Sequence, residues 1–202
     1  MSRTFRGFHG TRADVVGSIV ENGLQPSHDR DDWLGHGSYY FIEGLEDPWT
    51  SARDWARVNA WDKPSRRYRD ADFAVIEFKI TVDEECVFDF RVPSEAQQFH
   101  LARDRWLEQQ LRDRALDIGR PAEETYDTEL LNAFRAENRI AAMISTFPIQ
   151  LTVKERWFRF EFNIDNVAVL CVSHPITPPT SVEIVNIDVI TLDEVEDLEG
   201  PL

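Results

Sequence analysis

The chain has 202 residues, 42% hydrophobic and 11% aromatic, which is enough to bury a core as one domain and excludes a disordered chain. Its net charge is −15, from 37 acidic and 22 basic residues, which excludes a broad basic face for nucleic-acid backbones and leaves a local basic strip at residues 63–69. No apolar run reaches the roughly 20 residues that span a bilayer, and the N-terminal MSRTFRGFHG lacks the apolar stretch of a signal peptide. We therefore expect a soluble, cytoplasmic protein without a membrane partner.

Both cysteines, Cys86 and Cys171, lie in apolar, strand-like runs. Two cysteines in a chain of this length make no disulfide framework, and neither has a neighbour at metal-ligand spacing. We expect both to be reduced core residues, and we expect no metal site.

The first elements are predicted from local signals. Residues 4–9 are typical of a short strand. Thr11 is expected to cap the following helix, with Asp14 in the capping-box position, and Gly23 is expected to end that helix. Residues 25–32 are polar and rich in turn formers, which predicts a surface loop.

The middle of the chain predicts a helix and two strands. Asp47 precedes Pro48, and proline suits the first helical position, so a helix is expected to begin there with its tryptophans and alanines on one side. Residues 62–72 are charged and predict a loop. Residues 73–82 alternate well enough for a strand, and residues 85–90 predict another.

The second half begins with helices and ends with strands. Ser94 and Gln97 form a capping box that is expected to open a long helix reaching Ala115, and a second helix is predicted at residues 127–138. Three β-type runs follow, at residues 156–163, 167–172 and 181–190.

Strands and helices do not alternate regularly, so the pattern favours an α+β fold. We expect residues 1–192 to form a single domain with a helical insertion at about 94–138. An acidic tail at 193–202 follows it.

Two short motifs suggest a ligand site. In the His9-Gly10 step, glycine lets a ligand approach the main chain and the imidazole can bond a sugar hydroxyl. The alternative is a turn with a satisfied structural histidine. In Gly35-x-Gly37-x-Tyr39 the glycines permit close approach and the aromatic ring offers a stacking face. The alternative is a glycine-rich turn that leads into a buried strand, and the spacing is not that of a dinucleotide-binding fingerprint.

The motifs follow one another in a fixed order over residues 8–57: His9-Gly10-Thr11, Ile19…Gly23-Leu24, Gly35-His36-Gly37-Ser38-Tyr39-Tyr40 and Ser51-Ala52. Together they resemble the ADP-ribosyltransferase superfamily, on its poly(ADP-ribose) polymerase-like and diphtheria-toxin-like side. The run DWLGHGSYYF is similar to the form found in small bacterial and phage members. The resemblance covers about a quarter of the chain.

This resemblance implies a split antiparallel β-sheet that binds NAD, as a substrate, in a cleft. His9 would hold a hydroxyl of either the adenosine-side or the nicotinamide ribose. Tyr39, alone or with Tyr40, would stack on the nicotinamide ring, while the Gly10 main chain and Ser51 would bond its amide. The full set of NAD contacts that it implies is His9, Gly10, Thr11, Gly37, Tyr39, Tyr40 and Ser51.

Family members usually carry a third catalytic residue, often Glu, at the start of a late strand. In this chain that position falls at Asp165 or Asn166, with Glu161 and Glu155 as fallbacks. The implied catalytic set is therefore His9 and Tyr39 with Asp165 or Asn166. The missing Glu suggests mono-transfer or NAD hydrolysis, or an inactive binding module.

Three functions follow from these observations. The first is a mono-ADP-ribosyltransferase, a toxin or effector, that modifies a macromolecular acceptor, protein or nucleic acid, and that an antitoxin protein restrains. The second is a catalytically inactive module that binds NAD, ADP-ribose or a protein partner. The third is a relative that removes an RNA 2′-phosphate, which needs basic residues and a second histidine at the cleft.

Overall fold

The computed structural model describes residues 1–29, 32–62, 67–68, 72–115, 127–149, 167–176 and 178–191. Its strands are, in chain order, β1 (Ser2–Arg12), β2 (Ser38–Ile42), β3 (Trp61–Asp62), β4 (Arg67–Tyr68), β5 (Phe73–Asp83), β6 (Val87–Asp89), β7 (Ala142–Phe147), β8 (Val167–Val172) and β9 (Ser181–Ile190). Its helices are η1 (Ala13–Val15), α1 (Val16–Asn22), α2 (Pro48–Ala60), η2 (Glu84–Cys86), α3 (Pro93–Ala115) and α4 (Asp127–Asn138).

One large sheet organises the described residues. Its strand order is β6-β7-β8-β2-β1-β5-β9, and β3 pairs with β4 in a small separate ribbon. Every neighbouring pair in the large sheet is antiparallel except β6 and β7, which run parallel. The predicted α+β class is therefore confirmed.

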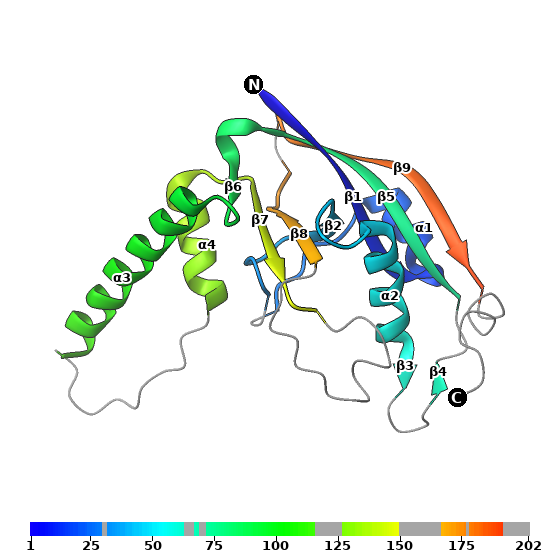
Figure 1. Ribbon diagram of the computed structural model, residues 1–202, viewed down its shortest axis with the longest axis horizontal. Coiled ribbons are helices and arrows are strands. Elements are labelled where there is room, and N and C mark those ends of the chain that lie inside the picture. The colour runs from blue at the N-terminus through cyan, green and yellow to red at the C-terminus, as the bar shows by residue number, and fades with distance from the viewer. Residues whose placement is uncertain are drawn as a thin grey trace.

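Each face of the sheet has its own core, because successive residues of a strand point to opposite faces. On one face, Phe8 of β1 and Val75 of β5 pack with Ala52 of α2. On the other face, Ile76 of β5 packs with Ile19 of α1. Helices therefore cover both faces of the central strands (Figure 1).

Helix α4 occupies residues 127–138, where it was predicted, and it belongs to the same core as α2. Leu131 and Phe134 of α4 are buried, and Phe99 of α3 packs against Phe134 with ring centroids 5.2 Å apart. Figure 1 shows α3 and α4 together on the side of the molecule away from β5 and β9.

Several local predictions are confirmed. Gly23 ends α1 with a φ of +76°, and its N–H donates to Ile19 O. Helix α2 begins at Pro48, and Asp47 accepts a hydrogen bond from the N–H of Thr50 at 2.8 Å. The predicted strands at 167–172 and 181–190 are β8 and β9, and the one at 73–82 lies within β5.

The predicted helix cap at Thr11 is wrong. Thr11 lies in β1, opposite Ala74 of β5, and the strand runs on to Arg12 instead of ending at residue 9. The helical turn after it has no side-chain cap, and Asp14 pairs with the Arg12 guanidinium. Pairing with a long neighbouring strand outweighs the local capping signal here.

The predicted boundaries around residues 85–94 also need correction. Residues Glu84–Cys86 form a 3-10 turn, so the strand is the short β6. Helix α3 begins at Pro93, which places Ser94 inside the first turn and makes its predicted capping role wrong. Strand β7 was not predicted; it lies between β6 and β8 and is buried over its first half.

Both cysteines are free; Cys171 is buried, whereas Cys86 is partly exposed. No helix among the described residues combines the length and apolar character needed to cross a bilayer. The predicted strand at 156–163, the core of the basic strip at 63–66 and the acidic tail at 193–202 lie outside the described residues.

Candidate functional site

The candidate site lies where two central strands part. Strand β1 pairs with β5 along its whole length, from Ser2 opposite Asp83 to Arg12 opposite Phe73. The other neighbour of β1 is β2. Among the described residues these two strands pair at one position, where Phe8 lies opposite Phe41. Beyond Phe8, the β1 edge that faces β2 is therefore free to border a pocket.

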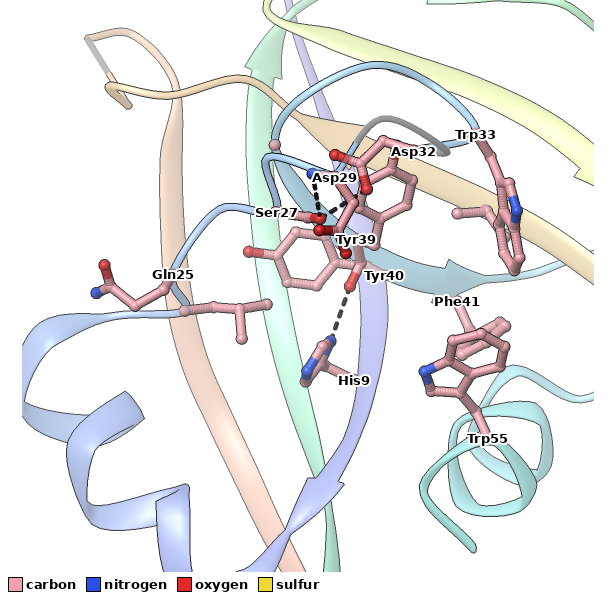
Figure 2. A pocket seen from close by; sticks show the side chains of 13 residues that line it. His9, Gln25, Ser27, Asp29, Asp32, Trp33, Tyr39, Tyr40, Phe41 and Trp55 are labelled. Atoms are coloured by element: carbon pink, nitrogen blue, oxygen red, sulfur yellow. Dashed lines mark hydrogen bonds between the residues drawn. The ribbon is translucent and has the colours of Figure 1, made fainter. Parts of the chain in front are cut away.

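A pocket of about 460 Å³ occupies this region, within the range of roughly 300–1,000 Å³ typical of small-molecule sites. Its walls come from β1, β2, the loop between α1 and β2, α2 and β8, as Figure 2 shows. The lining residues are His9, Leu24, Gln25, Ser27, Asp29, Asp32, Trp33, Gly37, Tyr39, Tyr40, Phe41, Trp55 and Val169.

His9 extends from β1 toward the backbone of β2. Its Nδ1 lies 3.0 Å from Tyr39 O (Figure 2). A carbonyl oxygen only accepts, so Nδ1 carries the proton and donates, and Nε2 of the neutral ring is an acceptor. Burial lowers the pKa of His9 below its ordinary value of 6.5, and the bond to Tyr39 O opposes this only in part. The neutral form therefore dominates at neutral pH.

The Tyr39 hydroxyl is held by the loop that precedes β2. It donates to Gly35 O at 2.7 Å and accepts from the N–H of Leu34 at 2.8 Å. Burial raises the pKa of Tyr39 well above its ordinary value of 10.0, so the phenol stays protonated. Trp33 meets the Tyr39 ring edge to face, with centroids 6.5 Å apart.

His9 and Tyr39 leave the sheet on opposite faces and still line one pocket. Tyr39 points toward the core that includes α2, whereas His9 follows Phe8 and points to the other face. Both side chains are nevertheless in the lining of the pocket at the junction of β1 and β2. The strands thus bring together two predicted residues that lie 30 positions apart.

Other predicted residues at the pocket are Gly37 and Tyr40. A Cβ on Gly37 would lie 2.4 Å from Val172 O, so a larger residue would collide with β8. Tyr40 is only 1% exposed and meets Phe78 edge to face at 5.1 Å. It therefore forms a pocket wall within the core, and its predicted stacking on a ligand stays a prediction.

Gly10, Thr11 and Ser51 are not among the described lining residues. Gly10 lies beneath α2, where an added Cβ would be 1.8 Å from Ala52 O. Ser51 is fully buried in α2, and its hydroxyl donates to Asp47 O at 3.1 Å. The contacts of Gly10, Thr11 and Ser51 to NAD stay predictions.

The predicted third catalytic position, Asp165 or Asn166, lies outside the described residues, as do Glu155 and Glu161. The described part of β8 begins at Val167, and β8 pairs with β2 so that Ala168 is opposite Ile42 while Cys171 is opposite Tyr39. The start of β8 thus lies toward the end of β2 that is farther from Tyr39. Val169 is the β8 residue that reaches the pocket.

Sequence analysis missed part of the lining. Asp29 and Asp32 come from the segment predicted as a surface loop, Trp33 directly follows it, and Trp55 lies on the apolar side of the predicted helix that begins at Pro48. The two indole rings meet edge to face with centroids 5.5 Å apart, and Trp33 is 38% exposed. The sequence did contain a signal for these lining residues, because the acidic loop leads directly into Trp33 and the two glycines of the motif, and binding residues are often found on loops.

Asp32 carries an unusual carboxylate. One oxygen accepts from Ser27 Oγ at 2.6 Å, while the other is buried and has no hydrogen-bond partner among the described residues. Leaving such a group unsatisfied costs about 1–3 kcal/mol, and such groups concentrate at binding sites. Among the described lining residues, Asp32 is therefore the one whose buried oxygen is open to accept a hydrogen bond from a ligand.

The described residues contain no cluster of three or more His, Cys, Asp or Glu side chains placed to hold a metal ion. The site instead combines aromatic rings, two carboxylates and one neutral imidazole. Such a set can hold a flat ring that carries positive charge, together with hydroxyl groups. Comparison of the chain with protein-family models, curated proteins and solved structures finds no match.

Proposed function

We propose that the protein is an NAD-dependent mono-ADP-ribosyltransferase that cleaves the nicotinamide glycosidic bond and transfers ADP-ribose to a macromolecular acceptor. The observation that carries the proposal is the meeting of His9 and Tyr39 at one pocket between β1 and β2. These are the two residues that the resemblance assigns to ribose and nicotinamide. An inhibitory protein partner and a split-sheet transferase fold belong to the same proposal.

The chemistry of the lining fits the nicotinamide end of NAD. Nicotinamide in NAD is a pyridinium cation, and aromatic faces and carboxylates both attract a cation. Trp33, Tyr39 and Trp55 supply the rings, and Asp29 and Asp32 supply negative charge. No Lys or Arg is among the described lining residues, so this pocket suits the cationic ring better than the diphosphate.

His9 suits a ribose hydroxyl. Because Nδ1 donates to Tyr39 O, the proton is fixed on that nitrogen and Nε2 accepts. A ribose hydroxyl that donates to Nε2 would be oriented by an imidazole whose own position is set by the backbone of β2. This arrangement would hold the sugar while the bond to its C1′ breaks.

In the proposed reaction the bond between nicotinamide nitrogen and ribose C1′ breaks, and both bonding electrons go to the nitrogen. The ribose becomes an oxocarbenium-like species, and an oxygen or nitrogen of the acceptor attacks C1′ and releases its proton to a solvent base. The carboxylates of Asp29 and Asp32 would stabilise the positive charge as it moves from the ring to the sugar.

A second function, a binding module without turnover, is favoured by one observation. The resemblance implies a Glu at the start of a late strand in active members, and in this sequence that position falls at Asp165 or Asn166. The missing Glu is compatible with mono-transfer or NAD hydrolysis, and in the binding module NAD would stay bound and uncleaved. Calorimetry that detects NAD binding while nicotinamide release stays at the background rate would favour this module.

The test of the transferase is release of nicotinamide from NAD by the purified chain, measured by chromatography. His9→Ala is compared with His100→Ala, because His100 is exposed on α3 and lies outside the lining. We expect turnover by the wild type and by His100→Ala, and a loss of about 100-fold in His9→Ala. A thermal melt of each variant shows that the chain remains folded.

Transfer itself is tested with labelled NAD and a cell lysate, where label should appear on a macromolecule. Release of nicotinamide without transfer would indicate NAD hydrolysis. If neither release nor transfer occurs, and His9→Ala binds NAD as the wild type does, the proposal is wrong.

A further inference from the structure

One face of α4 is directed at the loop before β2. Thr128, Asn132 and Arg135 are four and three positions apart, so they share one side of the helix. All three bond the main chain of residues 32–36. Thr128 Oγ1 donates to Asp32 O at 3.1 Å, which fixes the start of the loop.

Arg135 makes the central contacts. Its Nη2 donates to Leu34 O at 3.0 Å and its Nη1 donates to His36 O at 2.5 Å. Beside it, Asn132 Oδ1 accepts from the N–H of His36 at 2.8 Å. The two side chains thus bind the peptide groups on both sides of Gly35, which lies about 100 positions earlier in the chain. Arg135 can reach two carbonyls at once because its guanidinium is a planar fork with several donors.

The same loop segment holds the Tyr39 hydroxyl from its other side. Leu34 accepts from Arg135 through its carbonyl and donates to the Tyr39 oxygen through its N–H. Gly35 O accepts the Tyr39 proton in turn. The Arg135 guanidinium is therefore linked to the pocket phenol through the carbonyl and the N–H of one residue, Leu34, which lie in adjacent peptide units.

Arg135 is a costly residue for a merely structural link. It is 6% exposed, and among the described residues no carboxylate lies within ion-pair distance of it. Its other acceptor is Cys171 Sγ at 3.4 Å, and its Nε is buried without a partner in the described part of the chain. A buried cation held by carbonyl dipoles is retained against a large desolvation penalty.

Gly35 shows how closely α4 and the loop fit. Its φ is +79°, a region that favours glycine, and an added Cβ would lie 2.6 Å from Asn132 Oδ1. A residue with a side chain at position 35 would therefore be strained in φ and would push against Asn132 of α4.

We infer that Arg135 is the positioning residue of the pocket, which fixes the Tyr39 ring through the main chain of Leu34 and His36. Helix α4, part of the segment expected to be an insertion, thereby builds the site although none of its residues is in the described lining. The geometry stands without the proposed function; only the consequence for catalysis rests on it.

The test measures the Tyr39 ring directly, with the full chain labelled with 3-fluorotyrosine and observed by fluorine NMR. The chain has four tyrosines, so four signals are expected, and Tyr39→Phe identifies one of them. Arg135→Met removes the donors at similar length, and Arg135→Lys keeps a charge that can reach one carbonyl at a time. Arg112→Met is the control, because Arg112 is exposed and its bond in the described part of the chain is to Glu108, on the same helix α3.

We expect Arg135→Met to shift or broaden the Tyr39 signal while the other three keep their positions, and Arg135→Lys to have a smaller effect. Arg112→Met should leave all four unchanged. If the protein turns over NAD, Arg135→Met should lower kcat by about 10- to 100-fold with a smaller change in KM, because the ring is misplaced in the transition state.

If Arg135→Met does not fold, Asn132→Ser removes one loop contact at lower cost and takes its place in the same measurement. A folded variant whose Tyr39 signal matches that of the wild type would overturn the inference. An equal shift of all four signals would indicate general loosening and would also overturn it. A wild type that neither binds nor cleaves NAD refutes the proposed function alone, because the fluorine spectrum reports the ring without NAD.

Discussion

The two edges of strand β1 have opposite characters. Toward β5 it pairs without interruption from Ser2 to Arg12, and the inward side chains of β5 are almost fully buried. Toward β2 the register holds at Phe8 and then ends, and the space beyond becomes the pocket. One edge of β1 is therefore fully paired within the sheet, and the other edge borders the pocket. Because different contacts are made at the two edges, we expect that substitutions can change stability and ligand binding separately.

The side chains at the two edges differ accordingly. Ile76 and Ile80 on the paired side are fully buried hydrocarbon. On the open side, His9 is partly exposed, Tyr39 is held by loop main chain, and one oxygen of Asp32 has no partner among the described residues. Groups of this kind weaken a fold and suit a binding site.

The largest expected effect is that of Gly10→Ala, which would disrupt the packing of α2 on strand β1. The added Cβ would lie 1.8 Å from Ala52 O, a main-chain atom of α2 that cannot move aside cheaply. We expect a loss of about 5 kcal/mol or more in the free energy of unfolding, measured by chemical denaturation.

Gly17→Ala is the control for that experiment. Nothing lies within 4 Å of an added Cβ there, and Gly17 is inside α1, so alanine should stabilise by about 0.5–1 kcal/mol. Comparable losses at the two glycines would show that β1 and α2 are not in this close contact.

Ile80→Ala sharpens the comparison between the edges. Ile80 has no exposed surface and pairs with Phe5 of β1, away from His9, so its truncation should cost roughly 2–5 kcal/mol while NAD binding changes little. Tyr39→Phe on the open side should cost only about 1 kcal/mol and should weaken any NAD turnover. Urea titration and calorimetry on both variants decide whether the two properties separate in this way.

The third prediction concerns pH. The folded chain holds the pKa of His9 below 6.5, so as the pH falls through 6.5 the unfolded chain takes up the proton first. The His9 contribution to stability is therefore fully present above about pH 6.5 and decreases as the pH falls, until the folded pKa is reached, by about 1.4 kcal/mol for each unit between the two pKa values.

His9→Asn, which can still donate to Tyr39 O, should lose stability less steeply below pH 6.5 than the wild type. His174, whose pKa burial also lowers, is present in both proteins and cancels in the difference. Parallel stability curves for wild type and variant between pH 7 and pH 5 would contradict the depressed pKa.

The smallest expected effect is at Arg6, on the paired side. Arg6 donates to both carboxylate oxygens of Glu77, at 2.6 and 3.1 Å, but its side chain is 70% exposed. Arg6→Ala should lower the melting temperature only slightly, and raising the salt concentration should shrink the difference further. A large or salt-independent change would show that the pair supports the β1–β5 edge more than its exposure indicates.

The sequence predicted the elements whose signals are local. Pro48 after Asp47 fixes the start of α2, Gly23 fixes the end of α1, and the apolar spacing in 127–138 fixes α4. The fold class followed from the order of such elements. Thr11 was misread because its capping signal competes with β5 along the whole of β1, a neighbour more than 60 positions away.

The candidate site was predicted in part. His9, Gly37 and Tyr39 belong to a recognisable motif and do line one pocket. The roles of Asp32 and Arg135 depend on contacts between distant segments, such as Arg135 with the carbonyl of Leu34, and main-chain acceptors leave no trace in side-chain patterns. Strand β7 was missed because a short apolar run directly after a predicted helix cannot be told from a continuation of that helix by periodicity alone.

The order of strands in the sheet also bears on how the protein is made. β1 is translated before every other strand of the sheet, whereas Val169 of β8 is the last of the described lining residues in chain order. A nascent polypeptide on the ribosome therefore carries His9 without the complete lining until β8 has been made. The pocket can receive a ligand only after residue 169 has left the ribosome.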